Sequence, residues 1–172
     1  AARAIGSSRP LGYLEPLEPR QLLATTISGA AAGPNGVHDT WNLAGNWDNG
    51  IPSGAEDAIV AANVTAEAWN TTTPAYTGSL TLEDNATLQM GWTTSYPESL
   101  NALGGAGVTM NDGSQIRLRM PAPTPIFLPA ITMAGDASIH LSPSTSAHHT
   151  RRELDDAISG AGVLTVIGNN NN

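Results

Sequence analysis

Three stretches of the chain align without gaps and decide its fold. They read Leu80-Thr-Leu-Glu-Asp-Asn-Ala-Thr-Leu-Gln-Met90, Val108-Thr-Met-Asn-Asp-Gly-Ser-Gln-Ile-Arg-Leu118 and Ile131-Thr-Met-Ala-Gly-Asp-Ala-Ser-Ile-His-Leu141. In each stretch apolar and polar residues alternate on both sides of a short polar centre. A period of two is typical of a β-strand, so each stretch predicts a strand, a turn and a second strand.

The spacing of these copies favours a solenoid. The copies begin at residues 80, 108 and 131, and a fourth, partial copy begins at Leu164, so the starts are 28, 23 and 33 residues apart. Such spacings are typical of solenoid coils. We therefore predict an all-β chain that forms a parallel β-solenoid, or β-helix, of a few irregular coils stacked in register. Its core would contain the inward residues of each copy: Leu80, Leu82, Leu88, Val108, Met110, Ile116, Ile131, Met133 and Ile139.

The turn inside each copy leaves two arrangements open. A two-residue hairpin would pair Leu82 with Thr87 and mix the two faces, so it is excluded. A three-residue hairpin needs a left-handed residue at Asn85, Gly113 and Asp136. A solenoid corner keeps the same face inside, and the coil-like repetition favours it. A β-sandwich made of hairpins is the alternative fold.

Composition restricts the class of protein further. The 172 residues include 18 Gly and 12 Pro, and only 13% are charged, which suits short strands joined by turns. The net charge of −8, without a single lysine, disfavours nucleic acid as a partner. The absence of cysteine excludes disulfides and thiolate metal sites. No apolar run is long enough for a transmembrane segment.

The first 36 residues differ from the rest. Pro16 and Pro19 prevent a helix and leave their segment extended. Residues 24–36 are mostly small and end in Gly-Pro-Asn-Gly, which indicates a linker or a processing region. A helix from Gln21 to Ala32 is the alternative. We expect residues 1–36 to form an extended or disordered N-terminal segment and residues 37–172 to form the solenoid domain of a longer protein.

Residues 10–24 read Pro-Leu-Gly-Tyr-Leu-Glu-Pro-Leu-Glu-Pro-Arg-Gln-Leu-Leu-Ala, and this segment resembles the LEPR-XLL motif of large exported bacterial surface proteins. The resemblance implies a role in sorting and a location at the cell surface or outside the cell. It assigns the recognition core to Leu17, Glu18, Pro19, Arg20, Leu22 and Leu23.

A second resemblance covers roughly residues 40–170. The stretch Thr40-Trp-Asn-Leu-Ala-Gly-Asn-Trp-Asp-Asn-Gly-Ile-Pro-Ser-Gly-Ala-Glu-Asp-Ala-Ile59 is similar to the opening coil of autotransporter-associated β-strand repeat proteins, which are adhesin-like solenoids. The ending Ile158-Ser-Gly-Ala-Gly-Val-Leu-Thr-Val-Ile-Gly-Asn-Asn170 is similar to one of their repeat units. Trp41 and Trp47 would then cap the open end of the stack, because a solenoid needs an atypical terminal unit.

Groups that could bind metal are arranged poorly for that purpose. His148 and His149 are adjacent and would point to opposite sides of a strand, while His38 and His140 lie apart from them. Turn acids could bind calcium, but the glycine-rich nonapeptide of calcium-binding β-rolls is missing. We expect these acids, which are Asp84, Asp112 and Asp136, to accept hydrogen bonds from backbone N–H groups. We predict neither a metal site nor a cofactor.

Catalysis would require outward charges to converge in a groove. Arg117 and Arg119 share one strand face, with Glu83 or His140 on neighbouring coils, which could imitate a polysaccharide site. A solvated face with pairing between strands is the simpler interpretation. We expect a structural or adhesive module of an exported bacterial cell-surface protein, without enzyme activity. Its partners would be other segments of the same long chain, neighbouring surface proteins or extracellular polysaccharide.

Two rival functions remain open. A polysaccharide-binding or polysaccharide-cleaving β-helix would show acids and arginines gathered in a groove. A β-sandwich carbohydrate-binding domain would expose an aromatic platform, with Trp69 or Trp92 stacked on sugar.

Overall fold

The structure is a computed structural model. It describes residues 24–28, 40–68, 78–90, 106–118, 126–141, 152–154 and 157–168. Of residues 126–128 and 152–154 it describes the backbone.

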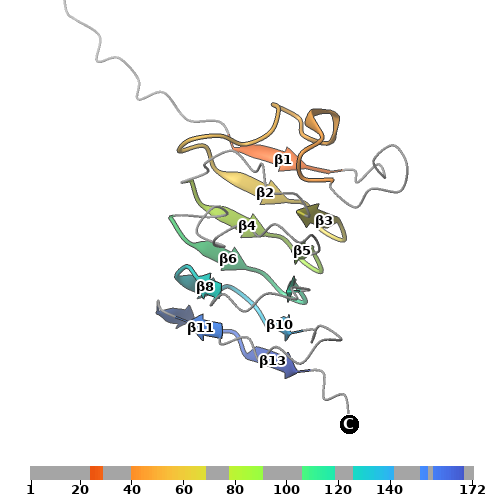
Figure 1. Cartoon of the computed structure of the whole chain (residues 1–172). Helices are drawn as coiled ribbons and strands as arrows, with labels where there is room; N and C mark the ends of the chain where they lie inside the picture. The colour runs from red at the N-terminus through yellow and green to blue at the C-terminus, as the bar shows by residue number, and fades with distance from the viewer. Residues whose placement is uncertain are drawn as a thin grey trace, which may run out of the picture.

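The described chain is a stack of parallel strands (Figure 1). The first sheet has the order β1 (Thr25–Ile27), β2 (Ala58–Val60), β4 (Leu80–Leu82), β6 (Val108–Met110), β9 (Ile131–Met133) and β12 (Ile158–Gly160). The second has the order β13 (Leu164–Gly168), β10 (Ala137–Leu141), β7 (Gln115–Leu118), β5 (Thr87–Met90) and β3 (Thr65–Ala68). A third, two-stranded sheet pairs β11 (Arg152–Leu154) with β8 (Ile126–Leu128). One short 3₁₀ helix, η2 (Ala44–Asn46), lies between β1 and β2.

Each coil contributes one strand to each of the two large sheets. The chain passes from β4 in the first sheet to β5 in the second through a corner at Asp84 and Asn85, and then returns to begin β6. The prediction of an all-β, parallel, solenoid-like fold is therefore confirmed. The hairpin alternative is wrong, because β4 and β5 belong to different sheets instead of pairing with each other.

The three aligned copies stack in register, as the sequence predicts. Leu80 pairs with Val108, and Val108 pairs with Ile131 in the first sheet. In the second sheet Leu88 pairs with Ile116, which pairs with Ile139. Equivalent residues of successive copies therefore lie directly beside each other in the stack.

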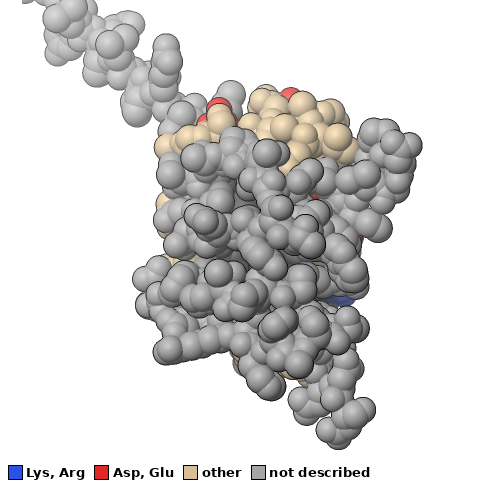
Figure 2. Space-filling model, in the orientation of Figure 1, with Lys and Arg blue, Asp and Glu red and all other residues tan. Residues whose placement is uncertain are grey.

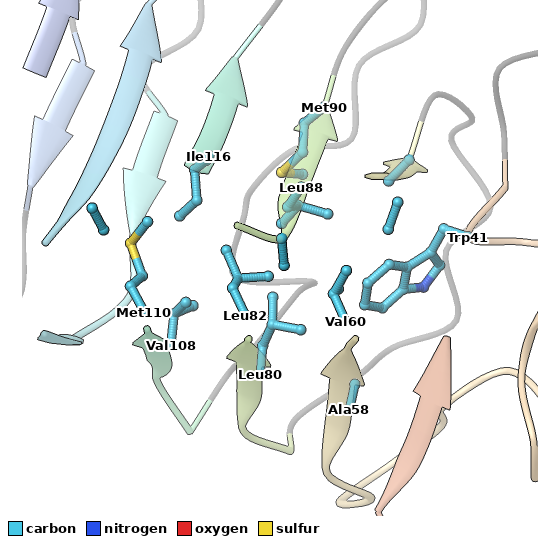
Figure 3. Close-up of a cluster of buried hydrophobic side chains, with 14 of the residues drawn as sticks. Trp41, Ala58, Val60, Leu80, Leu82, Leu88, Met90, Val108, Met110 and Ile116 are labelled. Atoms are coloured by element: carbon cyan, nitrogen blue, oxygen red, sulfur yellow. The ribbon is translucent and has the colours of Figure 1, made fainter. Parts of the chain in front are cut away.

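The interior between the two sheets is filled by the alternate apolar residues. All nine core residues named from the sequence are at most 3% exposed. Figure 3 shows side chains from the strands of both sheets pointing toward one another, with Leu82 and Met110 from the first and Leu88 and Ile116 from the second. Ser114 brings a hydroxyl into this core, where the neighbouring copies have Ala86 and Ala137.

The fourth copy begins earlier than the sequence alignment placed it. Ile158 pairs with Ile131, whereas Leu164 pairs with Ala137 and so belongs to the second half of its coil. Both halves of a copy share the same alternation, and Gly160 occupies the inward place that Met133 fills in the preceding coil. The missing side chain removed the signal for the first half.

An additional copy, Ala58–Ala68, was missed. Its residues pair in register with the next copy, from Ala58 beside Leu80 to Ala68 beside Met90. Alanine occupies several of its inward positions, and alanine contributes little to a hydrophobic pattern. Asn63, at the same corner position as Asn85, is the clearest signal that the sequence offers.

The expected linker contains the first strand of the sheet. Residues 25–27 form β1 and pair with β2, and Thr25 and Ile27 are buried. A linker or a helix at these residues is therefore wrong, and the start of the solenoid lies before residue 37. A strand of three residues, two of them threonine, is too short to show a period in the sequence.

The corners depend on residues that accept a left-handed backbone. Asn63, Asn85 and Gly113 have φ angles of 62°, 57° and 70°. Asparagine and glycine tolerate this region better than other residues. The corner after β9 differs, because Asp136 is not among the left-handed residues there. The N–H groups of Asn85 and Gly113 each donate to a carbonyl of the following coil, so the corners are also stacked.

The register predicts that one coil can be removed without loss of the fold. Deletion of residues 82–109 removes one 28-residue repeat and places Met110 at the inward position of Leu82. We expect this variant to unfold cooperatively and to be shorter by one strand spacing, about 4.8 Å. Circular dichroism during heating and small-angle X-ray scattering would measure both properties.

The matched control deletes residues 82–108, which is one residue fewer. It places Thr109 at the inward position and shifts the following strand by one residue, which turns its apolar side chains outward. We expect a much lower melting temperature for this variant. Equal melting temperatures for the two deletions would contradict the in-register core.

Candidate functional site

The N-terminal cap, residues 40–51, covers the outer edges of both large sheets. Over β1, the N–H of Asp48 donates to the Thr26 carbonyl at 3.1 Å, and the Thr26 N–H donates to Asp48 Oδ1 at 2.7 Å. Over β3, the Trp41 N–H donates to the Glu67 carbonyl at 3.0 Å, and the Glu67 N–H donates to Thr40 Oγ1 at 2.8 Å. The cap thus provides partners for backbone groups that an edge strand would otherwise expose.

Trp41 and Trp47 lie at the place where the sequence analysis expected a cap. They are 1% and 5% exposed, and their rings meet edge to face with centroids 4.8 Å apart. The indole N–H of Trp47 donates to the Trp41 carbonyl at 2.7 Å, so its polar group is satisfied inside the cap. Figure 3 shows the Trp41 ring beside Val60, at the end of the row of core side chains. In Figure 2 the described atoms at the top of the view are mostly uncharged.

Acidic side chains near the corners and strand ends bind backbone groups of neighbouring coils. Glu83 accepts from the Ala62 N–H at 3.0 Å, and Asp57 accepts from the Ser79 N–H at 3.1 Å. Asp112 accepts from the Asp136 N–H at 3.2 Å, and Asp136 in turn accepts from the Val163 N–H at 2.9 Å. The expectation that turn acids serve the backbone is confirmed for Asp112 and Asp136, although the N–H groups belong to the next coil.

Hydroxyl groups form a column on the outer face of the first sheet. The parallel register places Thr81, Thr109, Thr132 and Ser159 side by side on β4, β6, β9 and β12. We call these four residues the hydroxyl column. Adjacent members are separated by one strand spacing, about 4.8 Å. Thr81 and Thr109 are half-buried, and Thr132 and Ser159 are exposed. The face is therefore a regular row of hydroxyls that increases in exposure toward β12.

The outer face of the second sheet is polar and internally bonded. Gln89 donates to Glu67 at 2.8 Å across adjacent strands, and Arg117 donates to Gln115 from two nitrogens at 3.1 and 2.9 Å. His140 lies next to Arg117 in the register. Partial burial lowers the pKa of His140, and the positive charge of Arg117 lowers it further.

The structure brings together only some of the charged residues that the sequence suggested as a group. His140 is beside Arg117, but Glu83 lies at a corner, where it binds the backbone of the preceding coil. Arg119 lies outside the described residues. Among the described members of this group, Arg117 donates to Gln115, and Glu83 accepts from the backbone of the preceding coil.

Several other residues named from the sequence lie outside the described part of the chain. They are the sorting motif at residues 17–23, the histidines His38, His148 and His149, and the tryptophans Trp69 and Trp92. Among the described residues, no three histidine, aspartate or glutamate side chains gather closely enough to hold a metal ion. Asp84 is exposed at its corner.

Comparisons with known proteins give no relative. No family model, curated protein or solved structure matches this chain. Within the described residues, the structure contains no helix with the length and apolar character that a membrane crossing needs.

The roles of Asp48 and Thr40 were missed from the sequence. Both residues sit next to the tryptophans that drew attention, and each replaces a strand partner with a side-chain oxygen. An Asp directly after the Gly-Asn-Trp segment was the available signal. A single polar residue in a loop has no periodic pattern, so its hydrogen bond to an edge strand can be recognised only in the folded structure.

Asp48 provides a test of the cap. The hydrogen bond from the Thr26 N–H lowers the pKa of Asp48 below its ordinary value of 3.8. A carboxylate with a lowered pKa stabilises the folded state above its unfolded pKa, and the contribution disappears as pH falls through the folded pKa. We therefore expect Asp48→Ala to lower the melting temperature at neutral pH, and the difference from the wild type to shrink as the pH falls below 3.8.

The control for this prediction is Asn49→Ala, which changes an exposed neighbour whose side chain lies outside these contacts. It should leave the melting temperature unchanged across the same pH series. A difference between Asp48→Ala and wild type that is constant down to the lowest pH would contradict the role of the ionised carboxylate.

Proposed function

We propose that this chain is a structural module of an exported bacterial cell-surface protein, in which the coil stack acts as a stiff spacer. The observation that carries the proposal is the continuous register from β1 to β12 in the first sheet and from β3 to β13 in the second. Each coil binds the next through backbone hydrogen bonds, and the corner acids Glu83, Asp112 and Asp136 add side-chain bonds between adjacent coils.

A module of this kind extends a chain by a fixed step per coil. Stability in a solenoid is approximately a sum of coil and interface contributions, so its length can vary while its cross-section stays the same. The unequal spacings of the copies fit this role, because the differences fall between strands and leave the stacked positions unchanged. A catalytic groove, in contrast, would require particular side chains at particular coils.

The location of the module is proposed from the resemblance of residues 10–24 to the LEPR-XLL motif. Export also agrees with the absence of cysteine, which leaves no thiol to oxidise outside the cell. The acidic surface would disfavour adsorption to anionic lipid. These points from the sequence support the proposed location, and the coil stack supports the proposed role as a spacer.

The sorting motif can be tested in a bacterium that exports proteins with this motif. We expect the wild-type chain to be cleaved by protease added outside intact cells and to bind antibody there. The double variant Leu22→Ala, Leu23→Ala should remain protected inside the cells. The matched control, Leu11→Ala with Leu14→Ala, changes two leucines outside the motif and should be exported normally.

Two results would contradict this part of the proposal. Wild-type chain that stays protected from external protease would exclude export by this route. Equal exposure of the Leu22→Ala, Leu23→Ala variant and the wild type would show that the motif does not direct sorting.

Binding of polysaccharide is the second candidate function, and the hydroxyl column favours it. Hydroxyl groups at a regular spacing can donate to and accept from the hydroxyls of a sugar polymer. The net charge of −8 favours neutral polymers over acidic ones. This candidate is compatible with the spacer, because an adhesin presents a binding face on a stiff body.

Removal of hydroxyls from the column tests this candidate. The variant Thr109→Val, Thr132→Val keeps the shape of both side chains and loses two hydrogen-bonding groups. If the column binds neutral polysaccharide, affinity should fall about fivefold for each hydroxyl, as expected for a loss of about 1 kcal/mol. Thr165→Val, on an exposed position of β13, is the control. Equal binding by all three proteins, measured by calorimetry, would exclude the column as the site.

A further inference from the structure

One asparagine of the N-terminal cap is exposed and is followed directly by glycine. Asn49 and Gly50 lie in a bend outside the strands, with Asn49 exposed and Gly50 half-buried. Gly50 has a φ angle of 89°, and no atom lies within 4 Å of the place where a Cβ would be. A glycine in open space leaves its neighbours free to rotate. The side chain of Asn49 can therefore approach the backbone of Gly50.

The two groups that would react at this place are not engaged elsewhere. Within the part of the chain that the structure describes, the backbone N–H of Gly50 donates to no acceptor, and the side chain of Asn49 makes no hydrogen bond. Attack by the Gly50 nitrogen on the side-chain amide carbon of Asn49 closes a cyclic imide. Because both groups belong to adjacent residues, this attack has the advantage of an intramolecular reaction.

Other asparagines in the described chain are protected by the fold. Asn63 and Asn85 are each followed by a residue whose N–H donates to a backbone carbonyl of the same corner, at 3.1 and 2.9 Å. Asn46 is followed by Trp47, whose N–H donates to a carbonyl at 3.2 Å. A nitrogen whose N–H is held in a backbone hydrogen bond is a poor nucleophile, because attack would break that bond. Asn49 has neither this protection nor a following side chain.

We infer that Asn49 is a site of spontaneous deamidation, and that this modification loosens the N-terminal cap. The Gly50 nitrogen bonds to Cγ of Asn49, and the side-chain nitrogen leaves as ammonia with the proton of the N–H. Water then opens the cyclic imide. Hydrolysis of the bond from Gly50 N to Cγ gives aspartate, and hydrolysis of its bond to the main-chain carbonyl carbon gives isoaspartate. Both products carry a new carboxylate, and neither an oxidant nor a reductant takes part.

The reacting residues lie between two groups that hold β1. The hydroxyl of Thr25, which is 2% exposed, lies 3.2 Å from Asp48 Oδ1 and 2.9 Å from the Gly50 carbonyl oxygen. In isoaspartate the main chain runs through Cβ and Cγ, so an additional methylene separates Asp48 from Gly50. The two acceptors then no longer fit one hydroxyl, and the cap loses part of its hold on β1. This inference depends on the cap and does not require the proposed function.

Mass spectrometry of the folded protein during storage at mildly basic pH tests the modification, because base removes the proton of the Gly50 N–H. We expect peptide mapping to find the exchange of NH2 for OH at Asn49, and fragmentation to identify aspartate and isoaspartate there. Asn63 and Asn85 should keep their amides in the same samples. Asn49→Gln should lose the modification, because its longer side chain closes a larger ring more slowly. An unmodified Asn49, or faster deamidation of Asn63 or Asn85, would overturn the inference.

The melting temperature of stored protein tests the effect on the cap. We expect complete conversion to isoaspartate to lower it by about 2–4 °C, as expected for the loss of one hydrogen bond. Asn49→Gln stored in the same way should keep its melting temperature, which also controls for Asn35, the asparagine before Gly36. Fresh Asn49→Asp adds the charge without the methylene and should melt with fresh wild type. An equal loss in stored Asn49→Gln, or in fresh Asn49→Asp, would contradict the loosening by isoaspartate.

Discussion

The pairing of parallel strands between successive coils is the constraint on which the rest of this structure depends. A parallel ladder fixes the register, and a shift by one residue would turn every inward side chain outward. Leu82, Met110 and Met133 therefore have to lie in one row, and they do. Some backbone N–H and C=O groups at the corners and at the outer strands have no partner within the ladder. The stacked corners, the corner acids and the cap supply partners for these groups.

The same constraint explains which polar residues occur at the corners. A corner must bend the chain from one sheet into the other without turning the inward face outward, and at three corners a left-handed residue makes this bend, namely Asn63, Asn85 and Gly113. The acids near these residues accept hydrogen bonds from the backbone of a neighbouring coil, which is the preceding coil for Glu83 and the following coil for Asp112. Asparagine and aspartate at these positions, which could resemble a ligand set, are therefore accounted for by the geometry of the bend.

Sequence reasoning predicted those parts of the fold that repeat with large side chains. The three copies with Leu, Met and Ile at their inward positions were found, and their register was predicted correctly. Ala58–Ala68 was missed because alanine gives a weak pattern, and Ile158–Gly160 because a glycine replaces the inward methionine. β1 was assigned to a linker because three residues cannot show a period. The tryptophans of the cap were noticed, whereas Asp48, which pairs with β1, needed the structure.

The N-terminal cap closes one edge of each large sheet. At the first end a loop of Trp, Asn and Asp side chains stops strand addition, with Asp48 in the place of a neighbouring strand. Asp48 and Thr40 therefore give a repetitive fold one defined edge, because each holds a backbone group that a further strand would otherwise bind.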